Sequence, residues 1–357
     1  MKYLFILGRN PELSIAEIVA VFGKKDFVKK WNAVLVLLEK IEDNAIEKFG
    51  GVYAIGETLC SCSEKEIEKK DIYLGSKNKV NYVLWDFSDK TESVREYLKR
   101  RFKSERVKAT EKKLNIMKLQ EGGTAGTSRE TIEEEFFVFE NYFGKIIQKP
   151  KFREIERRDM DKPVRREELS ISPRLAKIMI NLSKVKKDEV LLDPFCGIGV
   201  MLYEALLQKI KVIGIDLDKE AIAGARRNLE WGKFARERYS LINADSREIK
   251  INDKVNVIVT EPHLGEILKK IPTEEKAKEI INDFEKLIIS VISNLKENVN
   301  GRIVFTAPTI QTFKKNKRIS CDAERIHKAT GFKLLQKPIP EFREGQVVGR
   351  ELFVMGK

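Results

Sequence analysis

The C-terminal half of the chain alternates short apolar runs with longer amphipathic segments. This alternation is typical of a mostly parallel sheet whose strands are joined by right-handed helical crossovers. The last two apolar runs flank a proline-containing segment and predict a terminal antiparallel hairpin. We therefore expect a doubly wound α/β sheet over residues 169–357. Its predicted strands are residues 190–193, 211–216, 240–245, 255–259 and 301–306, and its predicted hairpin arms are residues 331–337 and 347–355.

The N-terminal half has shorter and more mixed elements. Over residues 1–55 the order strand, helix, strand, helix predicts a small α+β unit of the ferredoxin-like kind. Its first helix is expected to begin at Ser14, because Glu17 completes a capping box with that serine. Residues 56–148 continue with short strands and a basic amphipathic helix. A charged, proline-containing segment at 149–168 predicts a linker.

Charge points to a polyanionic partner. The 357 residues carry a formal net charge of +13, which favours nucleic acid as the first candidate, and the length fits two to three domains. Basic residues gather after the basic helix, and this stretch is the predicted RNA-contacting surface, although a solvated helix face has the same pattern. The predicted contacts are Arg100, Arg101, Lys103, Lys112 and Lys113.

The cysteines and apolar runs exclude other classes. Cys60 and Cys62 are spaced too tightly for a common zinc pair, and neither histidine is near them, so no metal site is expected. No apolar window is long enough to span a membrane, and the N-terminal apolar run is too short for a secretory signal. We expect a cytoplasmic protein. The oligomeric state is left open, with a monomer as one alternative.

The run from Val190 to Gly199 is the most informative feature of the chain. An apolar strand ends at Asp193, and a tight turn containing Gly197 and Gly199 leads into a helix. In doubly wound sheets, the turn between the first strand and the following helix binds nucleotides. The third glycine of a dinucleotide motif is replaced by Leu202, and an acid before the turn suits a ligand with a positive end. These residues therefore indicate S-adenosylmethionine rather than NAD.

The next two predicted strands also end in acids. Asp216 is placed to bind ribose hydroxyls, and Asp245 is placed to accept a hydrogen bond from an adenine amine. A single acid at a strand end is usually a turn former, but three in succession around the glycine turn favour a cofactor site. The predicted cofactor-binding residues are Asp193, Phe195, Gly197, Gly199, Asp216, Leu217, Asp245 and Ser246.

Three segments carry a resemblance to a known family. Residues 193–199 (Asp-Pro-Phe-Cys-Gly-Ile-Gly) resemble the first motif of class I methyltransferases that act on exocyclic amines. Residues 157–182 and the opening residues 3–14 are similar to the THUMP-containing tRNA guanine-N2 methyltransferases that modify the guanosine at position ten. The resemblance implies a Rossmann-like methyltransferase domain at 169–357 and, before it, a ferredoxin-like domain at 1–55, a THUMP-like RNA-binding domain at 56–148 and a linker at 149–168.

The catalytic motif departs from this family. The family pattern is Asp-Pro-Pro-Tyr-Gly after a fourth strand, whereas this chain has Glu261, Pro262, His263, Leu264 and Gly265. By this correspondence Glu261 and the carbonyl of Pro262 are the predicted catalytic groups, which would accept the two N–H bonds of a guanine amine. The predicted base contacts are His263, Leu264 and Pro308.

Two alternatives to a tRNA guanine-N2 methyltransferase stay open. The altered motif also fits an RNA-binding protein whose methyltransferase fold has lost or changed its chemistry. The same fold also serves enzymes that methylate an amine of another RNA base, or of DNA. The retained acids and glycines of the cofactor corner favour an active enzyme, and the similarity to tRNA enzymes disfavours DNA.

Overall fold

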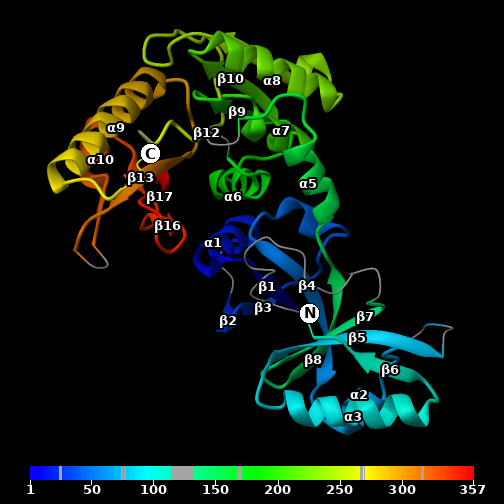
Figure 1. Cartoon of the computed structure of the whole chain (residues 1–357). Helices are drawn as coiled ribbons and strands as arrows, with labels where there is room; N and C mark the ends of the chain where they lie inside the picture. Colours follow the sequence, from blue (N-terminus) through cyan, green and yellow to red (C-terminus); the bar gives the residue numbers. More distant parts are fainter. Residues whose placement is uncertain are drawn as a thin grey trace. The chain divides into compact units, whose positions relative to one another are not determined.

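The computed structural model describes the chain except for residues 24–25, 74, 76–77, 114–131, 167–170, 266–267, 269 and 315–316. The chain divides into two compact units, Met1–Lys151 and Phe152–Lys357. In Figure 1 the first unit runs from blue to green and the second from green to red. Each unit has its own sheet.

The N-terminal unit is built on one mixed sheet. Its described strands follow the order β2-β3-β1-β4-β8-β7-β5-β6. They are β1 (Lys2–Leu7), β2 (Phe27–Lys30), β3 (Ala33–Leu37), β4 (Val52–Ser61), β5 (Lys79–Phe87), β6 (Lys108–Glu111), β7 (Glu134–Phe139) and β8 (Tyr142–Gln148). The helical segments are α1 (Pro11–Phe22), η1 (Ala45–Lys48), α2 (Glu64–Glu68) and α3 (Thr91–Ser104).

The expected boundary after residue 55 falls inside β4. This strand pairs with β1 through its first half and with β8 through most of its length, so a single sheet passes through the boundary. The apolar cores nevertheless separate there: one cluster gathers residues between Tyr3 and Ile55, and another gathers residues between Ile67 and Phe143. The division into a ferredoxin-like and a THUMP-like part stays a prediction.

The start of the first helix differs from the expectation. Helix α1 begins at Pro11, and Asn10 caps it by accepting a hydrogen bond from the Leu13 amide. The Ser14 hydroxyl instead donates to the carbonyl of Gly51, at 2.7 Å, and the Glu17 carboxylate accepts from the amides of Gly50 and Gly51, each at 2.8 Å. The supposed capping box therefore ties α1 to the turn before β4.

The C-terminal unit contains the expected doubly wound sheet. Its described strands follow the order β11-β10-β9-β12-β13-β17-β15, and β14 and β16 pair with β13 and β17. Strands β9 to β13 are parallel, and β17 runs antiparallel to β13, as in class I methyltransferases. The strands are β9 (Val190–Asp193), β10 (Lys211–Asp216), β11 (Tyr239–Asn243), β12 (Val257–Thr260), β13 (Ile303–Gln311), β14 (Arg318–Ser320), β15 (Lys333–Leu334), β16 (Ile339–Glu341) and β17 (Val348–Gly356).

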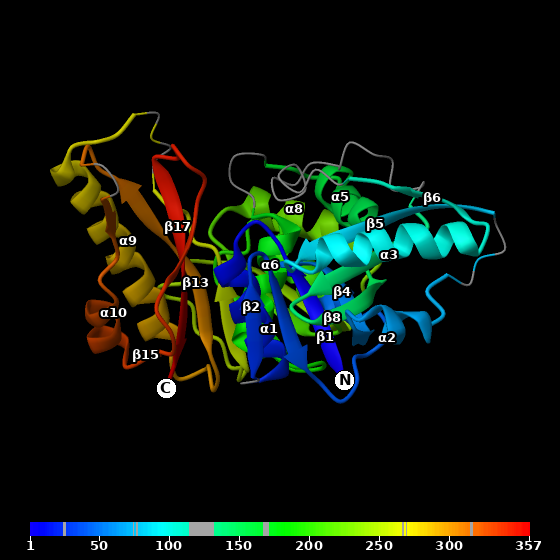
Figure 2. The same cartoon turned by 90° about the horizontal axis from the view of Figure 1, so that it is seen from below.

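Helices cover this second sheet. Figure 2 shows β13 and β17 side by side, with α9 and α10 beside them. Ser172 caps α6, as its position before Pro173 predicts, by accepting from the Leu175 amide. The helical segments are α5 (Phe152–Met160), α6 (Pro173–Ser183), α7 (Val200–Leu207), α8 (Lys219–Trp231), η3 (Arg236–Arg238), α9 (Glu274–Leu295) and α10 (Ala323–Thr330).

Two local expectations need correction. The predicted linker contains helix α5, and Arg158 on that helix pairs with the buried Glu204 of α7 at 2.9 Å. Residues 152–160 therefore belong to the C-terminal unit. Strand β13 continues through Pro308 to Gln311, so this proline lies inside a strand, opposite Arg350 of β17, and not at the strand's exit.

Candidate active site

The turn after β9 is shaped by its glycines and by Asp216. Gly197 and Gly199 have φ angles of +52° and +83°, in the left-handed region that favours glycine. A Cβ on Gly199 would also come within 3.2 Å of the Cβ of Ala225 on α8. Asp216, at the end of β10, accepts a hydrogen bond from the Gly197 amide at 2.8 Å. The acid of the second strand thus fixes the glycine turn of the first.

Asp193 is the buried acid of the site. Its Oδ1 accepts hydrogen bonds from the Thr260 hydroxyl at 2.6 Å and from the Phe195 amide at 3.1 Å. Burial raises the pKa of this carboxyl to about 7, against the opposing effect of the two hydrogen bonds; the neighbouring charges of Asp216 and Glu261 raise it further. Asp193 therefore changes charge near neutral pH, and a cationic ligand beside it would favour its charged form.

The motif after β12 places Glu261 at the same edge of the sheet. Its Oε1 lies 2.7 Å from Nε of Arg350 and accepts a hydrogen bond of 3.5 Å from Thr306 of β13. Burial raises the pKa of Glu261, while the charge of Arg350 opposes this rise. The glutamate is therefore held at a defined position next to a permanent cation. His263 is exposed, and its Nδ1 accepts from the Gly265 amide at 3.3 Å.

These segments enclose one cavity of about 540 Å³. It brings together most of the predicted site around the turn after β9 and the motif after β12. The predicted residues that line it are Asp193, Phe195, Gly197, Asp216, Glu261, Pro262, His263 and Leu264.

Other predicted residues are not among those that line the cavity. Leu217 is 68% exposed, and Ser246 donates to the carbonyl of Pro194 at 2.6 Å. Asp245 accepts from the Arg247 side chain at 2.9 Å, which lowers the pKa of its carboxyl. Gly199 is the N-cap of α7, and Pro308 lies within β13. Direct ligand contacts of these five residues stay predictions.

Sequence reasoning missed two arginines that line the cavity. Arg166 pairs with Asp218, the cap of α8, at 2.7 Å, and Arg350 arrives from β17. Arg166 belongs to the segment that the sequence predicts to be a linker. Arg350 carries no local sequence signal, because its neighbours in space come from strands that are far apart in the chain.

The chemistry of the lining fits S-adenosylmethionine. The Asp216 carboxylate lies at a strand end where ribose hydroxyls bind in this kind of sheet. The buried Asp193 carboxyl offers a counter-charge for an ammonium group. The open glycine turn, where a Cβ on Gly197 would meet nothing within 4 Å, leaves room for a ligand against the backbone. Groups that would hold the ribose and the ammonium of the cofactor are thus present on one cavity.

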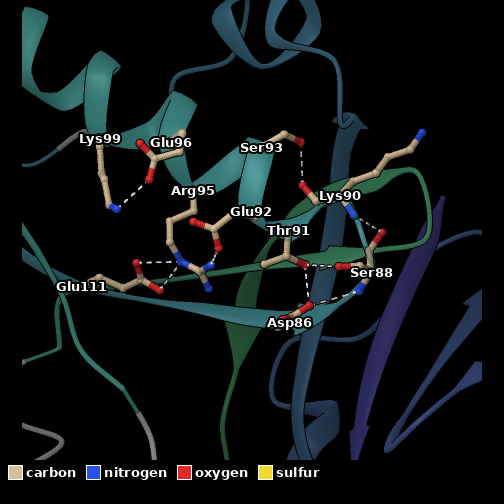
Figure 3. A network of polar contacts seen from close by, with 10 residues as sticks. All are labelled: Asp86, Ser88, Lys90, Thr91, Glu92, Ser93, Arg95, Glu96, Lys99 and Glu111. Atoms are coloured by element: carbon tan, nitrogen blue, oxygen red, sulfur yellow. Dashed lines mark hydrogen bonds and ion pairs between the residues drawn. The ribbon is translucent and has the colours of Figure 1, made fainter.

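The predicted RNA-contacting stretch of the N-terminal unit is partly engaged within the protein. Arg101 donates to the carbonyls of Ile67 and Lys70 at 2.6 and 2.8 Å, so it fastens α3 to α2. Figure 3 shows Lys99 beside Glu96 and Arg95 beside Glu92 and Glu111. Arg100 pairs with Glu64, Lys103 and Lys113 are exposed, and Lys112 is half-buried. Lys118 and the glycine-rich segment 121–128 lie outside the described residues.

Comparisons with known proteins match the chain to methyltransferases. Residues 163–333 match the family described as RMKL-like, methyltransferase domain, and residues 17–227 match the family described as DNA methylase. The chain is 37% identical over 139 residues to the tRNA (guanine(10)-N2)-dimethyltransferase of Methanothermobacter thermautotrophicus, and 34% identical over 142 residues to that of Methanocaldococcus jannaschii. These alignments cover 39% and 38% of this chain, and 39% and 37% of the relatives.

The relatives that align over nearly the whole chain are less similar to it in sequence. The enzyme of the same name from Pyrococcus abyssi is 25% identical over 348 residues, which is 94% of each chain. The crystal structure of TrmN from Thermus thermophilus covers 100% of both chains with a TM-score of 0.51 and 16% identity. A possible methylase from Clostridium difficile 630 gives a TM-score of 0.50 at 15% identity, over 100% of this chain and 98% of that one. These two structures support the fold.

The fold and the cofactor corner define a class I methyltransferase, the class that the family matches also describe. Within that class, the chain is similar in sequence to tRNA (guanine(10)-N2)-dimethyltransferases. The expectations for the fold class and for S-adenosylmethionine as cofactor are confirmed. The alignments with the first two relatives span about two fifths of those proteins' length.

Among the described residues, no group of three or more His, Cys, Asp or Glu side chains is arranged to hold a metal ion. In the same part of the chain, no helix has both the length and the apolar character needed to cross a membrane.

Proposed function

We propose that this protein transfers a methyl group from S-adenosylmethionine to the N2 amine of a guanosine in tRNA, at position ten. The observation that carries the proposal is the shared cavity: Glu261 and Pro262 face the same space as Asp193, Gly197 and Asp216. The turn that would bind the cofactor and the motif that would bind the amine therefore line the same cavity. The names of the relatives support the substrate.

The mechanism follows from the electronic structure of the amine. The N2 lone pair of guanine is delocalised into the ring, so the amine is a poor nucleophile. A carboxylate of Glu261 and the carbonyl of Pro262, each accepting one N–H, would let the nitrogen become pyramidal and turn its lone pair toward the methyl group. The bound cofactor supplies that methyl group as an electrophile on a sulfonium. After the transfer, the nitrogen loses one proton to solvent.

Holding both reactants in line supplies much of the remaining acceleration. Asp216 would hold the ribose and Asp193 the ammonium of the cofactor, while Glu261 and Pro262 orient the amine. The target amine lies inside folded tRNA, so the base must turn out of its stack to enter the cavity. His263 and Leu264 line the side where such a base would rest.

The direct experiment is incubation of the protein with unmodified tRNA and methyl-labelled cofactor, followed by mass analysis of the nucleosides. N2-methylated guanosine is the expected product. The proposal includes a cytoplasmic location, since tRNA is the substrate. DNA offers a matched negative control, because an amine methyltransferase for DNA would label duplex DNA and leave tRNA unlabelled.

We expect tRNA binding to depend on exposed lysines of the N-terminal unit. The double variant K103Q/K113Q should weaken the binding of different tRNAs to a similar extent. It should also reduce the slope of log affinity against log salt concentration by about one for each lysine removed. Fluorescence titration at several salt concentrations measures this slope. The matched control K278Q/K286Q removes two exposed lysines of α9. Equal slopes for the two double variants would contradict an RNA-contacting surface at Lys103 and Lys113.

A further inference from the structure

Arg350 lies where three strands meet beside the catalytic motif. It is opposite Pro308 on β13 and opposite Glu341 on β16. Its Nε is 2.7 Å from Oε1 of Glu261, and its Nη1 is 3.5 Å from Oε2 of Glu341. The side chain lines the cavity and is 29% exposed. It is therefore a cation fixed at the wall of the substrate site and open to what enters.

The two glutamates leave part of the guanidinium unused. An arginine side chain has five N–H donors in a planar fork. Glu261 is the ion-pair partner at Nε and Glu341 the one at Nη1, and among the described residues the buried Nε has no hydrogen-bond partner. A carboxylate acceptor and a guanidinium donor thus stand side by side in the cavity. A ligand edge with donors next to an acceptor would complement them.

The Watson–Crick edge of guanine has this order. The N2 amine and the N1–H are adjacent donors, and O6 follows as an acceptor. We propose that Arg350 is the guanine-specificity residue of this site: it donates to O6 while Glu261, which it holds in place, accepts from the amine side of the same edge. This inference rests on the proposed function, because it assumes that a base enters the cavity amine first.

The same pair disfavours the other bases that carry an exocyclic amine. Adenine and cytosine present a ring nitrogen lone pair beside their amine, where guanine has N1–H. That lone pair would face the Glu261 carboxylate and repel it. A polar site built for one set of partners rejects an analogue that leaves its groups unpaired. The arginine also explains how a buried glutamate is accommodated here, because a buried carboxylate needs a partner charge.

The test is a two-by-two comparison of enzyme and base. One tRNA carries guanosine at the target position, and the other carries 6-thioguanosine, whose sulfur is a weak acceptor but whose N1–H and N2 amine are kept. Single-turnover methylation by the wild type is expected to be about 10- to 100-fold slower on the thio base, because a hydrogen bond to a charged group is weakened. For R350Q the two substrates should differ by less than about threefold.

Controls separate the possible failures. R343Q changes an exposed arginine of the loop between β16 and β17 and should keep the wild-type ratio between the two bases. Cofactor binding by calorimetry shows whether R350Q is folded, and R350K offers a second variant that keeps the charge but not the fork. A wild type that methylates both bases equally, or an R350Q that keeps the wild-type ratio, overturns the role of Arg350. A wild type that does not label the normal guanosine instead overturns the proposed function.

Discussion

Replacing Glu261 with Gln is expected to lower the single-turnover rate of methyl transfer by about 100- to 10,000-fold. The amide keeps the length of the side chain but removes its charge, so it accepts a weaker hydrogen bond from the amine than a carboxylate does. It also breaks the charge pair with Arg350, whose Nε lies 2.7 Å away. Rapid-quench measurement of labelled methyl transfer to tRNA gives the rate, and calorimetry should show unchanged cofactor binding.

Glu261→Asp is the informative companion. The shorter side chain gives the acid of the family pattern Asp-Pro-Pro-Tyr-Gly, but it withdraws the carboxylate from Arg350. If the loop after β12 is adapted to glutamate, the Asp variant should be slower than the wild type. A faster Asp variant would show that the loop keeps the geometry of the common motif. An E261Q variant with the wild-type rate would remove Glu261 from the catalytic groups, and His263 would be the next residue to test.

Replacing Asp193 with Asn is expected to stabilise the protein at high pH and to weaken cofactor binding. The pKa of Asp193 is raised from 3.8 to about 7 in the folded protein. Well below pH 3.8, the carboxyl is neutral in both folded and unfolded states, and its burial costs little. Above pH 7 it is charged in both states, and burial of the charge destabilises the fold by about 4 kcal/mol as an upper bound.

The Asn variant keeps the acceptor for Thr260 and Phe195 without that charge. Its gain in the free energy of unfolding, measured in denaturant at several pH values, should therefore grow between pH 4 and pH 7. Asp188→Asn is the control of opposite sign. Arg238 lowers the pKa of this exposed acid, so the ionised carboxylate stabilises the folded protein. The D188N variant should therefore lose free energy of unfolding as the pH rises. A gain for D193N that is the same at pH 4 and pH 8 would contradict the buried charge.

Strong local signals made the centre of the methyltransferase domain predictable. Residues 191–193 of the apolar run that ends at Asp193 are buried, and the two glycines occupy φ values that other residues rarely adopt. Ser172 before Pro173 is a cap followed by a first-turn proline, and α6 begins there. In these segments each local preference agrees with the tertiary fold, so the pattern of residues is sufficient to predict the structure.

Other features depend on partners that the local sequence does not reveal. Helix α5 buries only Ile155 among its described side chains, so its pattern resembles a solvated linker, and its anchor is the Arg158–Glu204 pair. Ser14 and Glu17 have the spacing of a capping box, but their polar groups are used by a turn before β4. Arg350 reaches Glu261 only because β17 inserts antiparallel beside β13.

The most direct test of the central claim is methylation of tRNA with and without an N2 amine at the target position. Two transcripts are compared, one with guanosine at position ten and one with inosine, which lacks only that amine. The account predicts N2-methylated guanosine in the first and no label in the second. Equal label in both transcripts, or no label in either while cofactor and tRNA still bind, would contradict a tRNA guanine-N2 methyltransferase.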